Sequence, residues 1–137
     1  TMRFLGEIGE METELLLHFS GRYIYEATLI FGSSSINEDN CIQQYKFFEN
    51  LLSKKYGLTF TKVMRTDPVI DDLLYVRRCY PIKLGIEEVV TTWRTTEFKV
   101  ELALFGDDEL FIEITYQYLA HWRKAKRMEE QKLLKRF

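Results

Sequence analysis

Apolar and polar residues alternate in two stretches near the start of the chain. Residues 13–19 (TELLLHF) and 22–31 (RYIYEATLIF) are rich in β-branched and aromatic side chains. Ser20-Gly21 separates them, and glycine readily adopts the positive φ that a tight hairpin turn requires. The pattern therefore predicts a β-hairpin. One face of its second strand would carry Tyr23, Tyr25, Ala27, Leu29 and Phe31.

After residue 37 the apolar residues recur every three or four positions, which predicts a helix over residues 37–56. Ser35 and Glu38 have the spacing of a capping box at its start. Lys54 and Lys55 lie in its last turn, where the helix dipole favours cations, and Gly57 follows as a helix stop. We expect this helix to pack on a sheet through Ile42, Tyr45, Leu52 and one of Phe47 and Phe48.

Residues 58–64 (LTFTKVM) alternate again and predict a strand of the length found at sheet edges. Asp67-Pro68 is a typical helix opening, with Asp as N-cap and Pro in the first turn. A short helix around residues 70–77 would follow and would end before Pro81. Leu74-Tyr75-Val76 also suits a strand, so both interpretations stay open.

Three consecutive antiparallel strands are predicted over residues 86–93, 97–104 and 109–118, because apolar and polar positions alternate along them. From residue 119 the composition changes to Lys, Arg, Glu, Gln, Ala and Leu, which favours a C-terminal helix. The order of elements predicts a single α+β domain over 1–137. We expect a two-layer sandwich: an antiparallel sheet, one long helix packed on it, and a protruding basic helix over 119–137.

The charge is strongly segregated. Residues 122–137 carry seven Lys or Arg and two Glu, whereas the other 121 residues carry twelve basic and nineteen acidic residues. Residues 122–137 therefore have a charge of +5 and the rest of the chain, here called the body, has a charge of −7, which together give the net charge of −2. Clustered cations can attract an anionic partner. The basic positions chosen as candidate contacts are Arg123, Lys124 and Arg127.

Cys41 and Cys79 stand 38 residues apart without a CxxC motif. With only His18 and His121 as further N/S ligands, we expect no metal site and no cofactor. We expect the two cysteines to be free buried thiols, although a disulfide stays possible. The first ten residues lack the apolar core of a signal peptide, which slightly favours the cytoplasm over the cell envelope. No apolar run is long enough for a membrane span.

No stretch has the pattern of a known catalytic motif. Asp67, Asp71 and Asp72 are interpreted as helix-start residues, and residues 106–109 (GDDE) as an acidic turn. His18 and His121 have no neighbouring nucleophile in the sequence, so we expect structural or surface roles for both. The sequence thus favours a protein that is not an enzyme.

Several of these segments together resemble a group of short bacterial α+β domains. The similarity covers residues 13–116 and rests on packing and capping residues: Phe19, Gly21, Tyr25, Phe31, Lys55-Tyr56-Gly57, Trp93, Ile112, Ile114 and Tyr116. Many members of the group occur in exported or lipoprotein chains and have no established activity. The resemblance therefore implies a fold and supplies no active site.

The aromatic content suggests a binding surface. Tyr and Trp favour interfaces because one end of the ring system is apolar and the other polar. The candidate aromatic contacts are Tyr23, Tyr25, Trp93 and Tyr118, although the same rings also suit a core under the helix. We expect a non-catalytic protein-binding domain of adaptor, inhibitor or immunity type, whose partner is another protein or a second copy. The alternative is an anion or nucleic-acid binder that uses the basic helix, and an enzyme ranks third.

Overall fold

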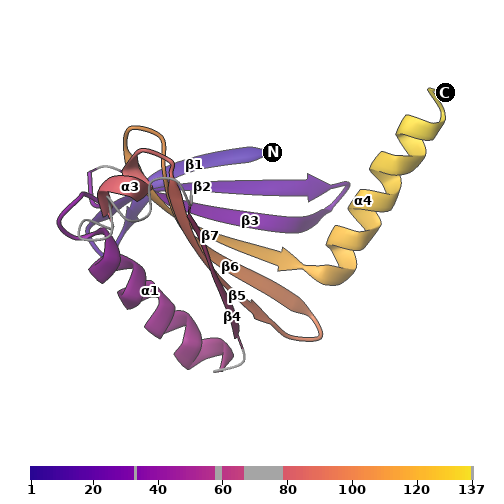
Figure 1. Ribbon diagram of the computed structural model, residues 1–137. Helices are drawn as coiled ribbons and strands as arrows, with labels where there is room; N and C mark the ends of the chain where they lie inside the picture. The colour runs from indigo at the N-terminus through magenta and orange to yellow at the C-terminus, as the bar shows by residue number, and fades with distance from the viewer. Residues whose placement is uncertain (33, 58–59, 67–78, 137) are drawn as a thin grey trace.

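The computed structural model describes residues 1–32, 34–57, 60–66 and 79–136 (Figure 1). The described strands are β1 (Met2–Ile8), β2 (Met11–Ser20), β3 (Tyr23–Phe31), β4 (Phe60–Thr66), β5 (Glu87–Arg94), β6 (Phe98–Gly106) and β7 (Leu110–Tyr118). The described helices are α1 (Cys41–Tyr56), α3 (Cys79–Lys83) and α4 (Leu119–Leu134). The α+β class is thereby confirmed. The helix expected around residues 70–77, with Asp67, Asp71 and Asp72, lies outside the described residues.

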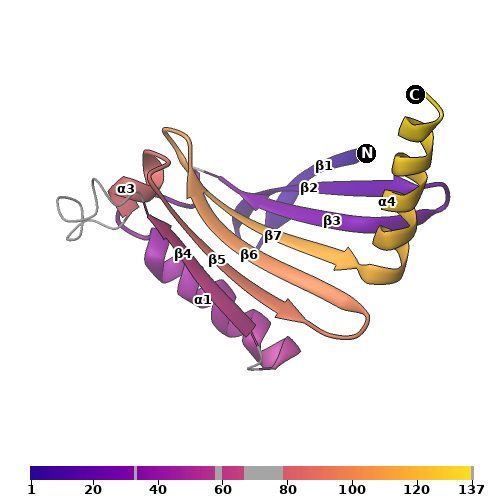
Figure 2. The ribbon, with the colours of Figure 1, turned by 45° about the vertical axis from the view of Figure 1, so that its right-hand side comes forward.

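All seven strands form one antiparallel sheet in the order β1-β2-β3-β7-β6-β5-β4. The chain runs through β1–β3, crosses with α1 to the far edge, and returns from β4 to β7 beside β3. Figure 2 shows that the sheet is strongly twisted, so the first three strands cross the last four at a wide angle. The predicted hairpin, edge strand and three-strand meander are confirmed, and β1 and β4 are the two edges.

Helix α1 covers one face of the β5–β7 part of the sheet (Figure 1). Its buried residues are Cys41, Tyr45, Phe48 and Leu52, while Phe47 is exposed. The ring of Phe48 lies 4.7 Å from that of Phe31 on β3. Residues at alternate positions of the strands complete the core: Val89, Trp93, Val100, Leu102, Leu104, Leu110, Ile112 and Ile114. The predicted packing face of the helix is confirmed.

A buried polar contact joins α1 to β5. Thr91 is fully buried, and its hydroxyl donates a hydrogen bond to Glu49 Oε2 at 2.8 Å. The Tyr45 hydroxyl also hydrogen-bonds to Thr91 Oγ1. Burial, together with the nearby carboxylate of Glu49, raises the pKa of Tyr45 well above its ordinary value, against the lowering effect of the Thr91 hydrogen bond. The two buried hydroxyls are thus paired with each other and with the half-buried Glu49.

The start of α1 differs from the predicted capping box. The helix begins at Cys41, and Asn37 Oδ1 accepts hydrogen bonds from the backbone N–H groups of Asp39 and Asn40. Glu38 does not cap the helix but pairs with Lys83 at 3.0 Å. The N-cap residue is Asn40, whose side chain makes no capping hydrogen bond, and Asn37 instead stabilises the turn that precedes the helix. The predicted end is confirmed: Gly57 has φ +90° and its N–H bonds to Ser53 O.

Strand β1 was not expected from the sequence. Residues 2–8 (MRFLGEI) pair along their whole length with β2, and Gly9 and Glu10 form the turn with φ values of +56° and +68°. Two consecutive residues at positive φ match the tight turns that suit the twist of a hairpin. The Gly9-Glu10 pair was the available signal, but glutamate rarely occupies such a position.

The expectation of free thiols is wrong, because Cys41 and Cys79 form a disulfide. The first residue of α1 and the first residue of α3 bring their Cα atoms to 6.0 Å, within the range that a disulfide requires. Sequence alone could not place these two helix starts side by side.

Helix α3 contains Pro81, whereas the helix predicted to end before Pro81 lies outside the described residues. Pro81 lies in the first turn of α3, where a proline replaces an N–H that has no helical partner. The β6–β7 turn packs against α3 so closely that a Cβ on Gly106 would lie 2.2 Å from Ile82 O. Only glycine fits at that position.

Candidate functional site

The predicted aromatic contacts are divided between the core and the surface. Trp93 is 1% exposed and packs under α1, so its ring is not accessible to a partner. Tyr25 is half-buried, with its ring 6.1 Å from that of His18. Tyr23 is exposed and Tyr118 half-buried, and both lie at the base of α4. The four predicted rings therefore do not form a single exposed surface, because Trp93 is buried in the core.

The base of α4 forms a cluster of rings and one cation. His121 lies between Tyr23 and Tyr118, with ring-centroid distances of 4.6 and 4.4 Å. Lys124 Nζ lies 5.7 Å from the centre of the Tyr23 ring, within cation–π range. His121 Nδ1 lies 3.2 Å from Ile24 O, and because a carbonyl only accepts, Nδ1 donates this bond. His121 thus anchors the helix, which agrees with its expected structural role.

The inner part of α4 is buried against the sheet, and beyond Ala125 a hydrogen bond from Ser20 Oγ to Met128 Sδ at 3.6 Å still joins the helix to β2. Leu119 and Ala125 are buried, and Leu119 N–H bonds to Glu97 O at 2.9 Å. Beyond Ala125, every described residue from 126 to 136 is exposed. Figure 1 shows the outer end of the helix extending past the β2–β3 hairpin, with the C-terminus at its far end.

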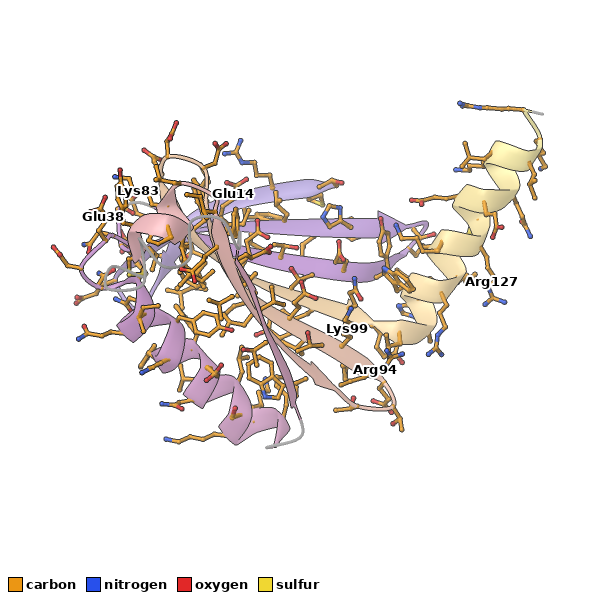
Figure 3. The ribbon with its side chains drawn as sticks, in the orientation of Figure 1. Glu14, Glu38, Lys83, Arg94, Lys99 and Arg127 are labelled. Carbon is orange, nitrogen blue, oxygen red and sulfur yellow. A yellow bond between two sulfur atoms is a disulfide. The ribbon has the colours of Figure 1, made fainter. Side chains whose placement is uncertain are left out.

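The exposed part of α4 combines cations with large apolar side chains. Arg127 points away from the sheet in Figure 3, and Arg123 and Lys124 are exposed as predicted. Leu133 and Leu134 are 55% and 67% exposed. Because more than half of each leucine stays exposed in the described chain, these side chains contribute little to its stability. A partner that covered them would gain the free energy of their removal from water.

The face of the sheet opposite α1 contains an acidic hollow of about 370 Å³. Glu26, Glu101 and Glu113 line it together with Lys99, and Glu26 accepts a hydrogen bond from Gln117 Nε2 at 2.8 Å. Desolvation raises the pKa of Glu113, and the charges of Glu101, Glu88 and Glu26 raise it further. Sequence analysis missed this hollow, although the alternation of each strand placed its residues on one face.

The hollow alone does not define a catalytic or metal site. Within the described ranges, no three His, Cys, Asp or Glu side chains are grouped closely enough to hold a metal ion. The acidic turn at residues 107–109 is structural, since Asp108 N–H bonds to Lys83 O. Neither α1 nor α4, nor any other described helix, has the length and hydropathy of a membrane span.

Comparison of the chain with protein-family models, curated protein sequences and solved structures finds no match. The features of the chain that bear on function are the exposed part of α4, the aromatic cluster at its base and the edges of the sheet.

Proposed function

We propose that the protein is a non-catalytic protein-binding domain whose helix α4 docks into an acidic, partly apolar groove of another protein. The observation that carries the proposal is the run of exposed residues from 126 to 136, which includes Met128, Leu133 and Leu134. An isolated helix segment with exposed leucines is typical of helix-in-groove recognition. The same residues would serve an adaptor, an inhibitor or an immunity-type protein.

The charge distribution supports a protein partner over a nucleic acid. The basic residues of α4 would attract a phosphate backbone, which makes nucleic-acid binding the alternative. The body of the protein, with its charge of −7, would repel phosphates that approach beyond the helix. Leucine side chains also contribute nothing to phosphate contacts, whereas they fill apolar pockets of a protein groove.

The disulfide supports a location in an oxidising compartment. Disulfides persist outside the reducing cytosol, so the Cys41–Cys79 bond argues against the cytoplasmic location favoured by the sequence. We place the proposed binding activity in the cell envelope or outside the cell.

The test compares the chain with two matched variants. Leu133→Ala/Leu134→Ala removes exposed leucines from α4, and Phe47→Ala/Leu51→Ala removes two apolar residues of α1 that are about half exposed. A binding protein is first captured from native extract, identified, and purified for titration against each chain. We expect the α4 variant to weaken binding at least about tenfold and the α1 variant to leave the Kd unchanged.

Equal binding by both variants would contradict the proposal. Capture of nucleic acid, with an affinity that falls steeply as salt rises, would replace the protein partner with the alternative function.

A further inference from the structure

Strand β1 is an exposed apolar edge. All seven of its residues are exposed, including Met2, Phe4, Leu5 and Ile8. Leu5 is 76% exposed and Phe4 is 45% exposed. In the described part of the chain, β1 pairs with β2 on one side and with no strand on the other. Such edges offer free backbone donors and acceptors to another strand, and monomeric proteins usually protect them.

The sequence of β1 is complementary to itself when it runs antiparallel to a second copy. In a register centred on Leu5, Arg3 of each copy faces Glu7 of the other. Met2 faces Ile8, and Phe4 faces Gly6, whose missing side chain leaves room for the aromatic ring. Opposite charges and apolar pairs placed directly across a ladder stabilise it. A shift of this register by one or two residues breaks the Arg3–Glu7 pairing.

Two like charges that face each other between β1 and β2 also favour a second copy of the chain as the partner. Glu7 lies opposite Glu12 in the β1–β2 register, and like charges directly opposite destabilise a ladder. Among the described residues, neither carboxylate forms an ion pair. Arg3 pairs with Glu14 at 2.6 Å, two residues along β2 from Glu12. An Arg3 side chain from a second copy would bring a positive charge next to Glu7.

We propose that β1 pairs antiparallel with β1 of a second copy of this chain, so that two seven-stranded sheets join into one continuous sheet. The interface is two-fold symmetric, because each contact between Arg3 and Glu7 occurs twice. The pairing covers Phe4, Met2 and Ile8 on the face that α1 covers elsewhere, and Leu5 on the opposite face. It involves no residue of α4 and stands or fails independently of the proposed function.

Charge exchange at residues 3 and 7 tests both the surface and the register. Arg3→Glu places two pairs of glutamates across the interface, and Glu7→Arg places two pairs of arginines. Each variant alone should associate at least about tenfold more weakly than the unmodified chain. An equimolar mixture of the two variants restores opposite charges and should recover the dimer. Residues 3 and 7 are exposed, so circular dichroism and thermal melting should confirm that each variant stays folded.

The measurement is sedimentation of the full chain from about 1 µM to about 1 mM, a range that covers weak and moderate association. We expect the mass to rise from 16.4 kDa towards twice that value with concentration, and the mixed variants to do the same. A monomer across the whole range would overturn the proposal. A dimer that is equally strong in both single variants would place the contact elsewhere and would also overturn it.

Discussion

Two regions of the molecule contain similar residue types in opposite environments. One is the part of the sheet under α1, and the other consists of β1 and the outer part of α4. Leu102 on β6 is fully buried, whereas Leu5 on β1 is 76% exposed. Within α1 itself, Leu52 is buried and Leu51 exposed. The α1-covered part therefore supplies the apolar burial that stabilises the fold. Exposed leucines at an edge strand and on an isolated helix instead mark surfaces where binding would bury them.

The disulfide belongs to the covered part and should have the largest effect on stability. It closes a loop of 38 residues, which corresponds to about 4 kcal/mol of chain entropy in the unfolded state. We expect urea unfolding with reductant to show a loss of roughly this size. Cys41→Ala/Cys79→Ala provides the control, since reductant should not change its midpoint. Two free thiols in the denatured, unreduced protein would contradict the pairing.

Substitutions within α1 should distinguish its buried face from its exposed face by their effect on stability. Leu52→Ala should lower the free energy of unfolding by about 3 kcal/mol, because it removes a leucine that is only 6% exposed. Leu51→Ala, one residue away and 47% exposed, should cost less than about 0.5 kcal/mol. Denaturant unfolding of both variants measures the difference. Similar losses would show that α1 does not pack in the described orientation.

Glu113 in the acidic hollow should make a smaller contribution to the stability of the protein, and this contribution should depend on pH. The folded state raises the pKa of Glu113, so it binds the proton more tightly than the unfolded state does. Stability contributed by this group is therefore lost as pH rises from the ordinary value of 4.5 through the raised value. Glu113→Gln should stabilise the protein at neutral pH, by no more than about 0.5 kcal/mol because solvent screens the partly exposed carboxylate, and should have no such effect well below pH 4.5. A variant less stable than the parent at neutral pH would contradict this cause.

Removal of the end of α4 after Met128 should have the smallest effect on the free energy of unfolding. Deletion of residues 129–137 removes residues that are exposed wherever they are described, so the free energy of unfolding should change by less than about 0.5 kcal/mol. Deletion of all residues after Tyr118 should cost about 2 kcal/mol, because it also removes buried Leu119 and Ala125. Thermal melting of both truncated chains checks the contrast. An equal loss for both would mean that the outer part packs on the body.

Sequence predicted those elements whose pattern is local. The α1 packing face follows from helical spacing, and β5, β6 and β7 follow from alternation. The Cys41–Cys79 bond, the burial of Trp93 and the acidic hollow depend on contacts between segments far apart in the chain, which periodicity does not encode. Strand β1 was missed because its alternation is weak and its turn contains a glutamate at positive φ. The exposure of Arg123, Lys124 and Arg127 followed from the sequence because charged residues on a helix are exposed by default.

Amide hydrogen exchange compares the two regions most directly, because protection reports the free energy of local opening. We expect amides in the middle of α1, around Tyr45 and Phe48, to exchange only on global unfolding. Amides of α4 beyond Met128 should exchange through local fraying, with protection close to that of an isolated helix end. Equal protection of the two helices would contradict the conclusion that stability resides in the α1-covered part, and it would remove the exposed helix end on which the proposed binding depends.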